Sequence, residues 1–153
     1  MTELPDLSLD AGGAFLRSAG LVVENAGPRE VTGTIDAGPE QHTPWGMVHG
    51  GVYAAAVESA CSIGASAAVM EAGQFAVGLF NHTDFIRAHT TGPLHVRATP
   101  VHQGRTGAAR TCSGPMVWAR MKSVWLESPT ANCPASMTAA EAPMLHALST
   151  AAA

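Results

Sequence analysis

Residues 45–62 read WGMVHGGVYAAAVESACS, and this stretch decides the fold. It opens a segment from His49 to about Ala72 that has no proline and is rich in alanine, which favours a helix. Small apolar residues recur along it at spacings of three and four, and Gly73 follows as a C-cap glycine would. Because so few of its side chains are large, such a helix can pack closely into a curved sheet. The stretch therefore predicts an α+β fold, in which antiparallel strands wrap a long central helix.

Strands are predicted on both sides of this helix. The segments with β-branched residues or alternating hydrophobicity are 21–25, 31–36, 75–87 and 94–103. In the third segment the alternation slips at Phe80 and Asn81, which predicts a bulge. In the fourth, Pro100 cannot donate a hydrogen bond to a neighbouring strand, so it predicts an edge position or a bend.

The domain organisation follows from the same pattern and from the length of 153 residues, which fits one domain. We expect residues 1–9 to form a disordered lead and residues 10–127 to form a single domain. After Gly104 prolines recur and alternation survives only around 117–126, so no strand hairpin is predicted there. Residues 128–153 are rich in Ala, Ser, Thr and Pro and predict a disordered tail. A GC-rich gene read out of frame would encode a similar mixture, so a shifted reading frame is a second hypothesis for this region.

The bulk composition excludes several classes of protein. Apolar residues make up 46% of the chain, enough for a core, whereas charged residues make up only 13%, which favours an oligomer that covers part of the surface. The net charge is −4 and basic residues form no run, so we expect no nucleic-acid partner. No apolar run reaches the ~18 residues that span a bilayer, and none resembles a signal peptide, so we expect no membrane association and a cytoplasmic location. The spacings of the three cysteines and seven histidines fit no metal site.

Gly50 and Gly51 stand at the start of the predicted helix. Glycine lets the backbone turn tightly and approach a ligand, and the first helical turn presents unpaired N–H groups at the positive end of the dipole. Those donors suit a carbonyl oxygen of a substrate and the oxyanion that it becomes. The alternative is a simple turn from loop to helix. His49 abuts the glycines, and three roles are open to it: orienting the loop, lining a pocket or transferring a proton.

Glu58 is the candidate carboxylate. No basic residue lies within helical reach of it, and its neighbours are small and apolar. Such a carboxylate is either a reactive group in a pocket or a solvent-facing residue on one helical stripe. Ser62, four residues on, lies on the same face and could hold the carboxylate or a water. Cys61 has no base nearby and is interpreted as a small core residue.

The spacing of these groups predicts an oligomeric site. Gly50 and Glu58 lie about 12 Å apart along one helix axis, so one substrate carbonyl cannot touch both within a subunit. If both serve one reaction, they come from two subunits. The active site is then expected at a homodimer interface.

Three blocks occur in order between about residues 45 and 106: WGMVHGGVYAAAVES, AVGLFNHTDFIR and LHVRATPVHQGRT. Together they resemble the hotdog-fold acyl-CoA thioesterases of the phenylacetate-pathway (PaaI) type. They are most similar to the 4-hydroxybenzoyl-CoA thioesterase branch, which has a glutamate on the central helix. The resemblance implies a hotdog fold and hydrolysis of an aromatic or medium-sized acyl-CoA to the free acid and CoA. It also implies no cofactor beyond the CoA of the substrate, and a homodimer that pairs into a dimer of dimers.

The resemblance implies roles for single residues as well. Glu58 would act as the nucleophile or as the base for water. The Gly50 N–H would bind the thioester carbonyl, and Ser62 stands where a threonine supports hydrolysis. The positions implied to bind CoA or to shape the substrate pocket are Gly51, Asn81, Arg87, Arg105 and Thr106.

Two departures from the family leave other functions open. Thr43 stands where the family has Asn or Gln, so the amide that helps to polarise the carbonyl is missing, and Gln41 or His42 would have to replace it. Losing one oxyanion donor costs about 10²–10³ in rate. The second departure is the absence of a predicted hairpin after Thr106. The alternatives are therefore a hotdog protein that binds acyl-CoA without turnover, and a hydratase or dehydratase, which usually needs a His/Asp pair.

Overall fold

The computed structural model of the chain describes residues 5–8, 11, 13–105, 107–113 and 117–127. Most of the predicted lead and the whole predicted tail, 128–153, lie outside these residues. The helices are α1 (Ala14–Ala19), α2 (Gly50–Ala67) and two short 3-10 helices, η1 (Pro39–Gln41) and η2 (Met70–Ala72). None of the helices in the described residues is long and apolar enough to cross a membrane. The strands are β1 (Leu21–Ala26), β2 (Val31–Ala37), β3 (Gln74–Phe85), β4 (Gly92–Gln103), β5 (Gly107–Ser113) and β6 (Val117–Glu127).

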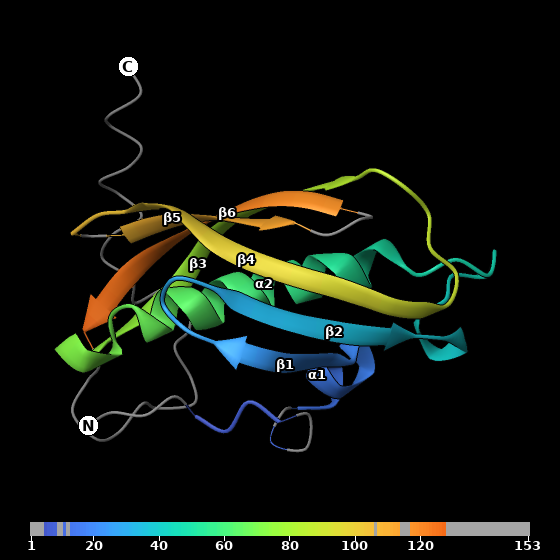
Figure 1. The fold of residues 1–153 in the computed structure, drawn as a ribbon, viewed down its shortest axis with the longest axis horizontal. Coiled ribbons are helices and arrows are strands. Elements are labelled where there is room, and N and C mark those ends of the chain that lie inside the picture. Colours follow the sequence, from blue (N-terminus) through green and yellow to red (C-terminus); the bar gives the residue numbers. More distant parts are fainter. Residues whose placement is uncertain (1–4, 9–10, 12, 106, 114–116, 128–153) are drawn as a thin grey trace, which may run out of the picture.

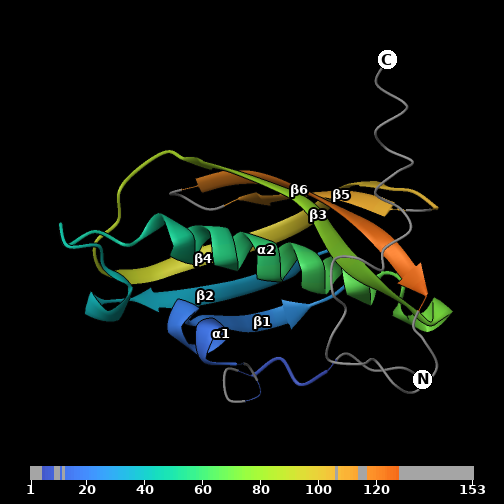
Figure 2. The same ribbon diagram turned by 180° about the vertical axis from the view of Figure 1, so that it is seen from behind.

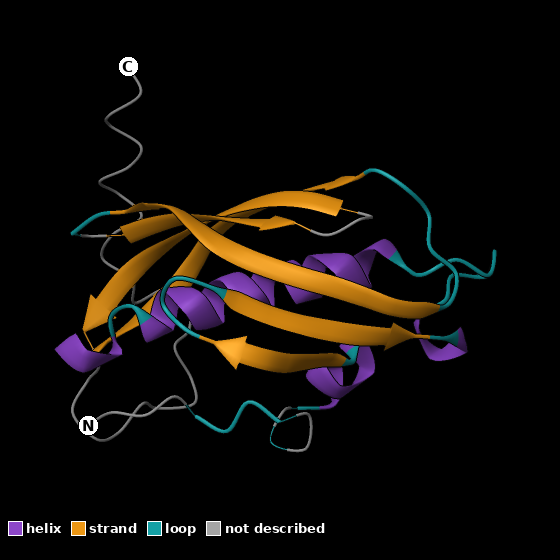
Figure 3. Ribbon diagram, in the orientation of Figure 1, coloured by secondary structure: helices purple, strands orange, loops and turns teal. Residues whose placement is uncertain are grey.

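The six strands form one antiparallel sheet in the order β1-β2-β4-β5-β6-β3. Figures 1 and 2 show the sheet curving around α2, with the edge strands β1 and β3 on either side of the helix. Figure 3 shows that strands make up most of the regular structure and that α2 is the one long helix among the described residues. The predicted α+β hotdog architecture, a long central helix wrapped by an antiparallel sheet, is confirmed.

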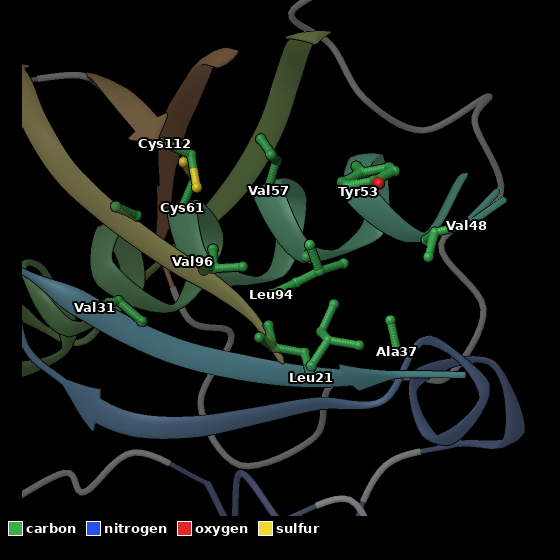
Figure 4. Packing of buried hydrophobic residues seen from close by; sticks show 14 residues of the cluster. Leu21, Val31, Ala37, Val48, Tyr53, Val57, Cys61, Leu94, Val96 and Cys112 are labelled. Carbon is green, nitrogen blue, oxygen red and sulfur yellow. The ribbon is translucent and has the colours of Figure 1, made fainter. Parts of the chain in front are cut away.

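The core lies between α2 and the concave face of the sheet. Every second residue is buried along β2 and along the first half of β4, so the period of two fixes which face of the sheet meets the helix. The helix contributes mostly small residues to this contact, which lets helix and sheet approach closely. The buried cluster, shown in Figure 4, consists of Leu21, Val31, Ile35, Ala37, Val48, Tyr53, Ala56, Val57, Ala60, Cys61, Leu94, Val96, Ala98 and Cys112.

The long helix ends earlier than the sequence indicates. α2 stops at Ala67, and Val69 leaves helical geometry with φ −124° and ψ −7°. The short helix η2 follows and ends at Gly73, whose left-handed φ of +71° is the C-cap conformation that the glycine predicted.

Both predicted strand irregularities occur, each at one register shift. β3 shifts against β6 between Gly78 and Phe80, next to the predicted slip. β4 shifts against β5 between Pro100 and His102. Since β4 lies between β2 and β5, the edge position considered for Pro100 is wrong, and a local irregularity accommodates the proline instead.

A strand hairpin follows Thr106, so the prediction that none is present there is wrong. β5 pairs with β4 and β6, and β6 pairs with β3, so the sheet is continuous from β1 to β3. The buried residues of β5 are Ala108, Arg110 and Cys112. Two of them are small and one is cationic. The alternation of large apolar residues that marks most strands is therefore missing from this part of the sequence.

Arg110 is a buried cation in this core. Its side chain is 1% exposed and lies against α2 at Gly64, where an added Cβ would sit 2.5 Å from Arg110 Nη2. Arg110 Nη1 donates a hydrogen bond to the Pro28 carbonyl at 3.0 Å, whereas Nε and Nη2 have no partner among the described residues. Burial lowers the pKa of this guanidinium.

Cys61 and Cys112 lie side by side next to this arginine, on α2 and β5 (Figure 4). Their thiols share a hydrogen bond, which raises the pKa of Cys61 and lowers the pKa of Cys112. The side chain of Cys61 is fully buried, so its interpretation as a core residue is confirmed.

Candidate active site

His49 is the N-cap of α2. Its backbone is extended, and its Nδ1 accepts a hydrogen bond from the Gly51 N–H at 2.8 Å. An accepting Nδ1 carries no proton, so the neutral ring has its proton on Nε2. The His49 backbone N–H donates to the Gln41 carbonyl at 2.8 Å, which fixes the entry to the helix. Of the three roles open to His49, this geometry supports orienting the loop.

His49 accepts hydrogen bonds from two backbone N–H groups of the first helical turn, and the N–H of Gly50 remains. The N–H groups of Gly51 and Val52 both donate to His49. The Gly50 N–H has no acceptor among the described residues. It therefore remains available to an oxygen of a ligand at the positive end of the helix dipole.

A cavity of about 300 Å³ adjoins this helix start, and we call it the helix-start cavity. A Cβ at position 50 would lie 3.2 Å from Phe85 Cζ, so the missing side chain of Gly50 keeps this region open. Its lining residues include Thr43, Trp45, Gly50, Tyr53, Phe85 and Arg87.

Glu58 lies at a second cavity, of about 330 Å³, which we call the carboxylate cavity. Ser62 Oγ donates a hydrogen bond to Glu58 Oε1 at 2.7 Å, as their shared helical face predicted. The Glu58 side chain is exposed within the single chain. The cavity walls come from α1, β1, α2 and the N-terminal segment, and include Leu7, Leu16, Leu21, Val23, Ala55 and Ile63.

The two cavities have no lining residue in common. Gly50 and Glu58 thus belong to separate halves of the molecule, although one helix carries both. A single chain does not bring them to one carbonyl, as their spacing predicted.

The polar side chains before the helix are already bonded to the protein. Thr43 Oγ1 and the Thr43 N–H both donate to the Met47 carbonyl, at 3.1 and 2.7 Å. The Gln41 side chain bonds Gly38 and Ser18, and His42 Nε2 bonds the Thr90 carbonyl. Neither Gln41 nor His42 lines the helix-start cavity, so neither stands where the missing amide would act.

The remaining predicted site residues are dispersed. Asn81 Nδ2 donates to the Ala54 carbonyl at 3.2 Å, which ties β3 to α2, and Asn81 lines neither cavity. Arg87 lines the helix-start cavity. Arg105 lies in the turn between β4 and β5, at the end of the sheet away from the helix start (Figure 1). Thr106 lies outside the described residues.

Tyr53 is a polar group of this region that sequence reasoning missed. Its ring lines the helix-start cavity and packs edge-on against Phe85, with ring centroids 5.9 Å apart. The signal in the sequence was its position three residues after Gly50, which places both on one helical face.

A pair of His49 variants should separate capping from other roles. His49→Ala should destabilise the fold by about 1 kcal/mol, because the cap is lost. His49→Asn should keep most of the stability, because an asparagine oxygen can accept from the Gly51 N–H in place of Nδ1. Urea unfolding measures both, and an equal loss in the two variants would contradict capping.

The described residues contain no cluster of three or more His, Cys, Asp or Glu arranged to hold a metal ion. The sequence profile of the thioesterase superfamily matches residues 46–110. ComA2 of Bacillus subtilis, assigned as an esterase, is 32% identical over 102 residues, which cover 64% of this chain and 78% of ComA2. Rv1847 of Mycobacterium tuberculosis, also assigned as an esterase, is 38% identical over 93 residues, which cover 60% of this chain and 66% of Rv1847, just under two thirds.

Solved structures show the same fold. The Rv1847 structure has a TM-score of 0.73 and 29% identity, and the match covers 76% of this chain and 99% of that one. The thioesterase HI1161 of Haemophilus influenzae also has a TM-score of 0.73, at 20% identity, over 87% of this chain and all of that one. The chain belongs to the thioesterase superfamily of hotdog-fold proteins.

Proposed function

We propose that this protein hydrolyses an acyl-CoA thioester to the free acid and CoA. The observation that carries the proposal is the Glu58–Ser62 pair, a carboxylate held by a hydroxyl at the edge of an apolar cavity. The cavity walls suit an acyl group, and the carboxylate at the cavity edge would take a proton from water or attack a carbonyl carbon. The relatives assigned as esterases support this reading.

Glu58 would act through the carboxylate oxygen that Ser62 does not hold. Either that oxygen removes a proton from water, whose oxygen attacks the carbonyl carbon, or it attacks the carbon itself and forms an anhydride that water then cleaves. In both routes negative charge builds on the carbonyl oxygen, where the Gly50 N–H would donate. This intermediate then collapses and the C–S bond breaks, which in the second route is the step that forms the anhydride. The CoA sulfur leaves as a thiolate that takes up a proton.

The two groups would meet across a homodimer. β3 is an edge strand, paired with β6 on one side only, and it carries the exposed residues Val77, Leu79 and Phe80. An open edge with apolar side chains is a surface that another strand covers. We expect β3 to pair with β3 of a second copy and to place Gly50 of one chain near Glu58 of its partner. The low share of charged residues, 13%, supports a further pairing of such dimers.

Coenzyme A would lie along the helix-start cavity. Arg87 lines this cavity and would meet a phosphate of CoA there. Arg105 stands at the opposite end of the sheet, so it would reach the same CoA only from another subunit. Since the Gly51 N–H is bonded to His49, Gly51 would shape the approach to the site without donating to the substrate.

The acyl group is proposed to be aromatic or medium-sized. The carboxylate cavity, at about 330 Å³, is at the small end of ligand sites, and its walls are largely apolar. A helix glutamate with a hydroxyl residue four positions on supports a likeness to the 4-hydroxybenzoyl-CoA branch. No cofactor enters this reaction.

A protein that binds acyl-CoA without turnover is the second candidate. One observation favours it: the side chains of Thr43, Gln41 and His42 are hydrogen-bonded to backbone groups. None of the three therefore replaces the missing amide. The test is thiol release from benzoyl-CoA and phenylacetyl-CoA by the wild-type protein. Binding of both compounds with no thiol release would favour this second function.

Mixing two inactive variants tests the shared site. Gly50→Val fills the helix-start cavity, because a Cβ there already lies 3.2 Å from the Phe85 ring, and Glu58→Gln removes the carboxylate. Neither variant alone should hydrolyse benzoyl-CoA. When the two are refolded together in equal amounts, half of the dimers are mixed and each has one of two sites intact. About a quarter of the wild-type activity should therefore return.

The control is each variant refolded with itself, which should stay inactive. The contradicting result is an active wild type together with a mixture that contains mixed dimers but stays inactive. Both groups would then act within one subunit, and the proposed interface would be wrong.

A further inference from the structure

Tyr53 is a buried polar residue at the helix start that the reaction above leaves unused. Its side chain is 7% exposed, and its hydroxyl is buried without a hydrogen-bond partner among the described residues. Folded proteins satisfy nearly all such groups with protein, water or ligand. Burial also raises the pKa of this hydroxyl, so it keeps its proton near neutral pH and remains a donor.

The side chain is placed beside the Gly50 N–H. Tyr53 follows Gly50 by three residues, and aromatic side chains in helices lean back over the preceding turn. Figure 4 shows Tyr53 on the early turns of α2, between Val48 and Val57. Phe85 contacts both positions, since its ring lies edge-on to Tyr53 and 3.2 Å from where a Cβ of residue 50 would be. All three residues line the same cavity.

We infer that the Tyr53 hydroxyl is a second hydrogen-bond donor to the thioester carbonyl oxygen, beside the Gly50 N–H. In this role it replaces the side-chain amide that the family has at the position of Thr43. This inference rests on the proposed thioesterase function. The Phe85 ring, 59% exposed, packs against Tyr53, and its displacement by the entering thioester would uncover the hydroxyl beside the Gly50 N–H, which is already available. Tyr53 is then a catalytic residue, because it touches the oxygen on which charge develops.

Tyr53→Phe tests this with the loss of one oxygen atom. We expect kcat/KM for benzoyl-CoA to fall by about 10²-fold, the lower end of the range for one oxyanion donor. We expect the midpoint of thermal unfolding to stay the same or rise, because the lost hydroxyl has no partner in the unliganded protein. A merely structural hydroxyl would give the opposite pattern, with lower stability and nearly unchanged turnover. The control is Thr34→Val, which removes a hydroxyl on β2 that lines neither cavity and should leave kcat/KM unchanged.

A spectroscopic measurement avoids dependence on turnover. A benzoyl-CoA analogue with a methylene in place of sulfur is not hydrolysed, and its carbonyl stretch reports hydrogen bonding. The stretch should lie at a lower frequency in the wild-type complex than in the Tyr53→Phe complex. If the wild type hydrolyses benzoyl-CoA but both proteins give the same stretch and the same kcat/KM, the role of Tyr53 is overturned and the proposed function stands. If the wild type neither hydrolyses benzoyl-CoA nor binds the analogue, both are overturned.

Discussion

Glu58→Gln should lower kcat/KM for benzoyl-CoA hydrolysis by about 10²–10⁴-fold, the range for loss of a positioned general base. An amide has nearly the same shape as the carboxylate, and its oxygen can still accept the Ser62 hydroxyl, so the cavity should keep its form. The amide can neither take a proton from water nor attack a carbonyl carbon. A continuous assay for the released thiol measures the fall in kcat/KM.

The matched control is Glu71→Gln on η2, an exposed glutamate that lines neither cavity. It removes the same charge from the surface and should leave kcat/KM within about twofold, as for surface changes in general. Equal activity of wild type and Glu58→Gln would remove Glu58 from the reaction and, with it, the principal support for the carboxylate cavity as the acyl site.

Arg110→Met should stabilise the protein by about 1–4 kcal/mol, the range found when buried ionic groups give way to apolar ones. The arginine is 1% exposed, and two of its three guanidinium nitrogens have no partner among the described residues. Methionine is flexible enough to fill the same space. The one hydrogen bond lost leaves the carbonyl of Pro28, an exposed residue that water can reach. Urea unfolding measures the change in the free energy of unfolding, provided that the dependence of this free energy on urea concentration is the same in both proteins.

Arg97→Met on the neighbouring strand β4 is the control. Arg97 pairs with Glu30 at 2.9 Å on the surface, with 60% of its side chain exposed, and such pairs contribute little to stability. Its replacement should leave the unfolding midpoint nearly unchanged. A clear loss of stability in Arg110→Met would mean that the guanidinium has a stabilising partner, such as an ordered water or an anion.

The fold was predictable because its deciding element is local. The composition of 49–72 specifies a long helix of small residues. Buried residues occupy every second position along β2 and along the first half of β4. The hairpin of β5 and β6 was not predictable in this way. The buried side of β5 is alanine, arginine and cysteine, so nothing in its pattern distinguishes the buried face from the exposed one.

The candidate site was predictable only in part, for a similar reason. Glu58 and Ser62 are four residues apart on one helix, so their hydrogen bond follows from helical geometry alone. The proton position on His49, the bonded state of Thr43 and the unpartnered hydroxyl of Tyr53 depend on contacts with distant segments or on loop geometry. No periodicity reports these contacts, so only the three-dimensional structure reveals them.

The contact between Gly64 and Arg110 limits the order in which this chain can change during evolution. Alanine at position 64 would favour the helix over glycine by about 1 kcal/mol, yet its methyl group would lie 2.5 Å from Arg110 Nη2. A lineage that keeps the arginine therefore obtains this gain only by moving the buried guanidinium, whereas the full gain is open once a shorter residue has replaced it. The effect of one substitution at position 64 thus depends on which residue already stands at position 110.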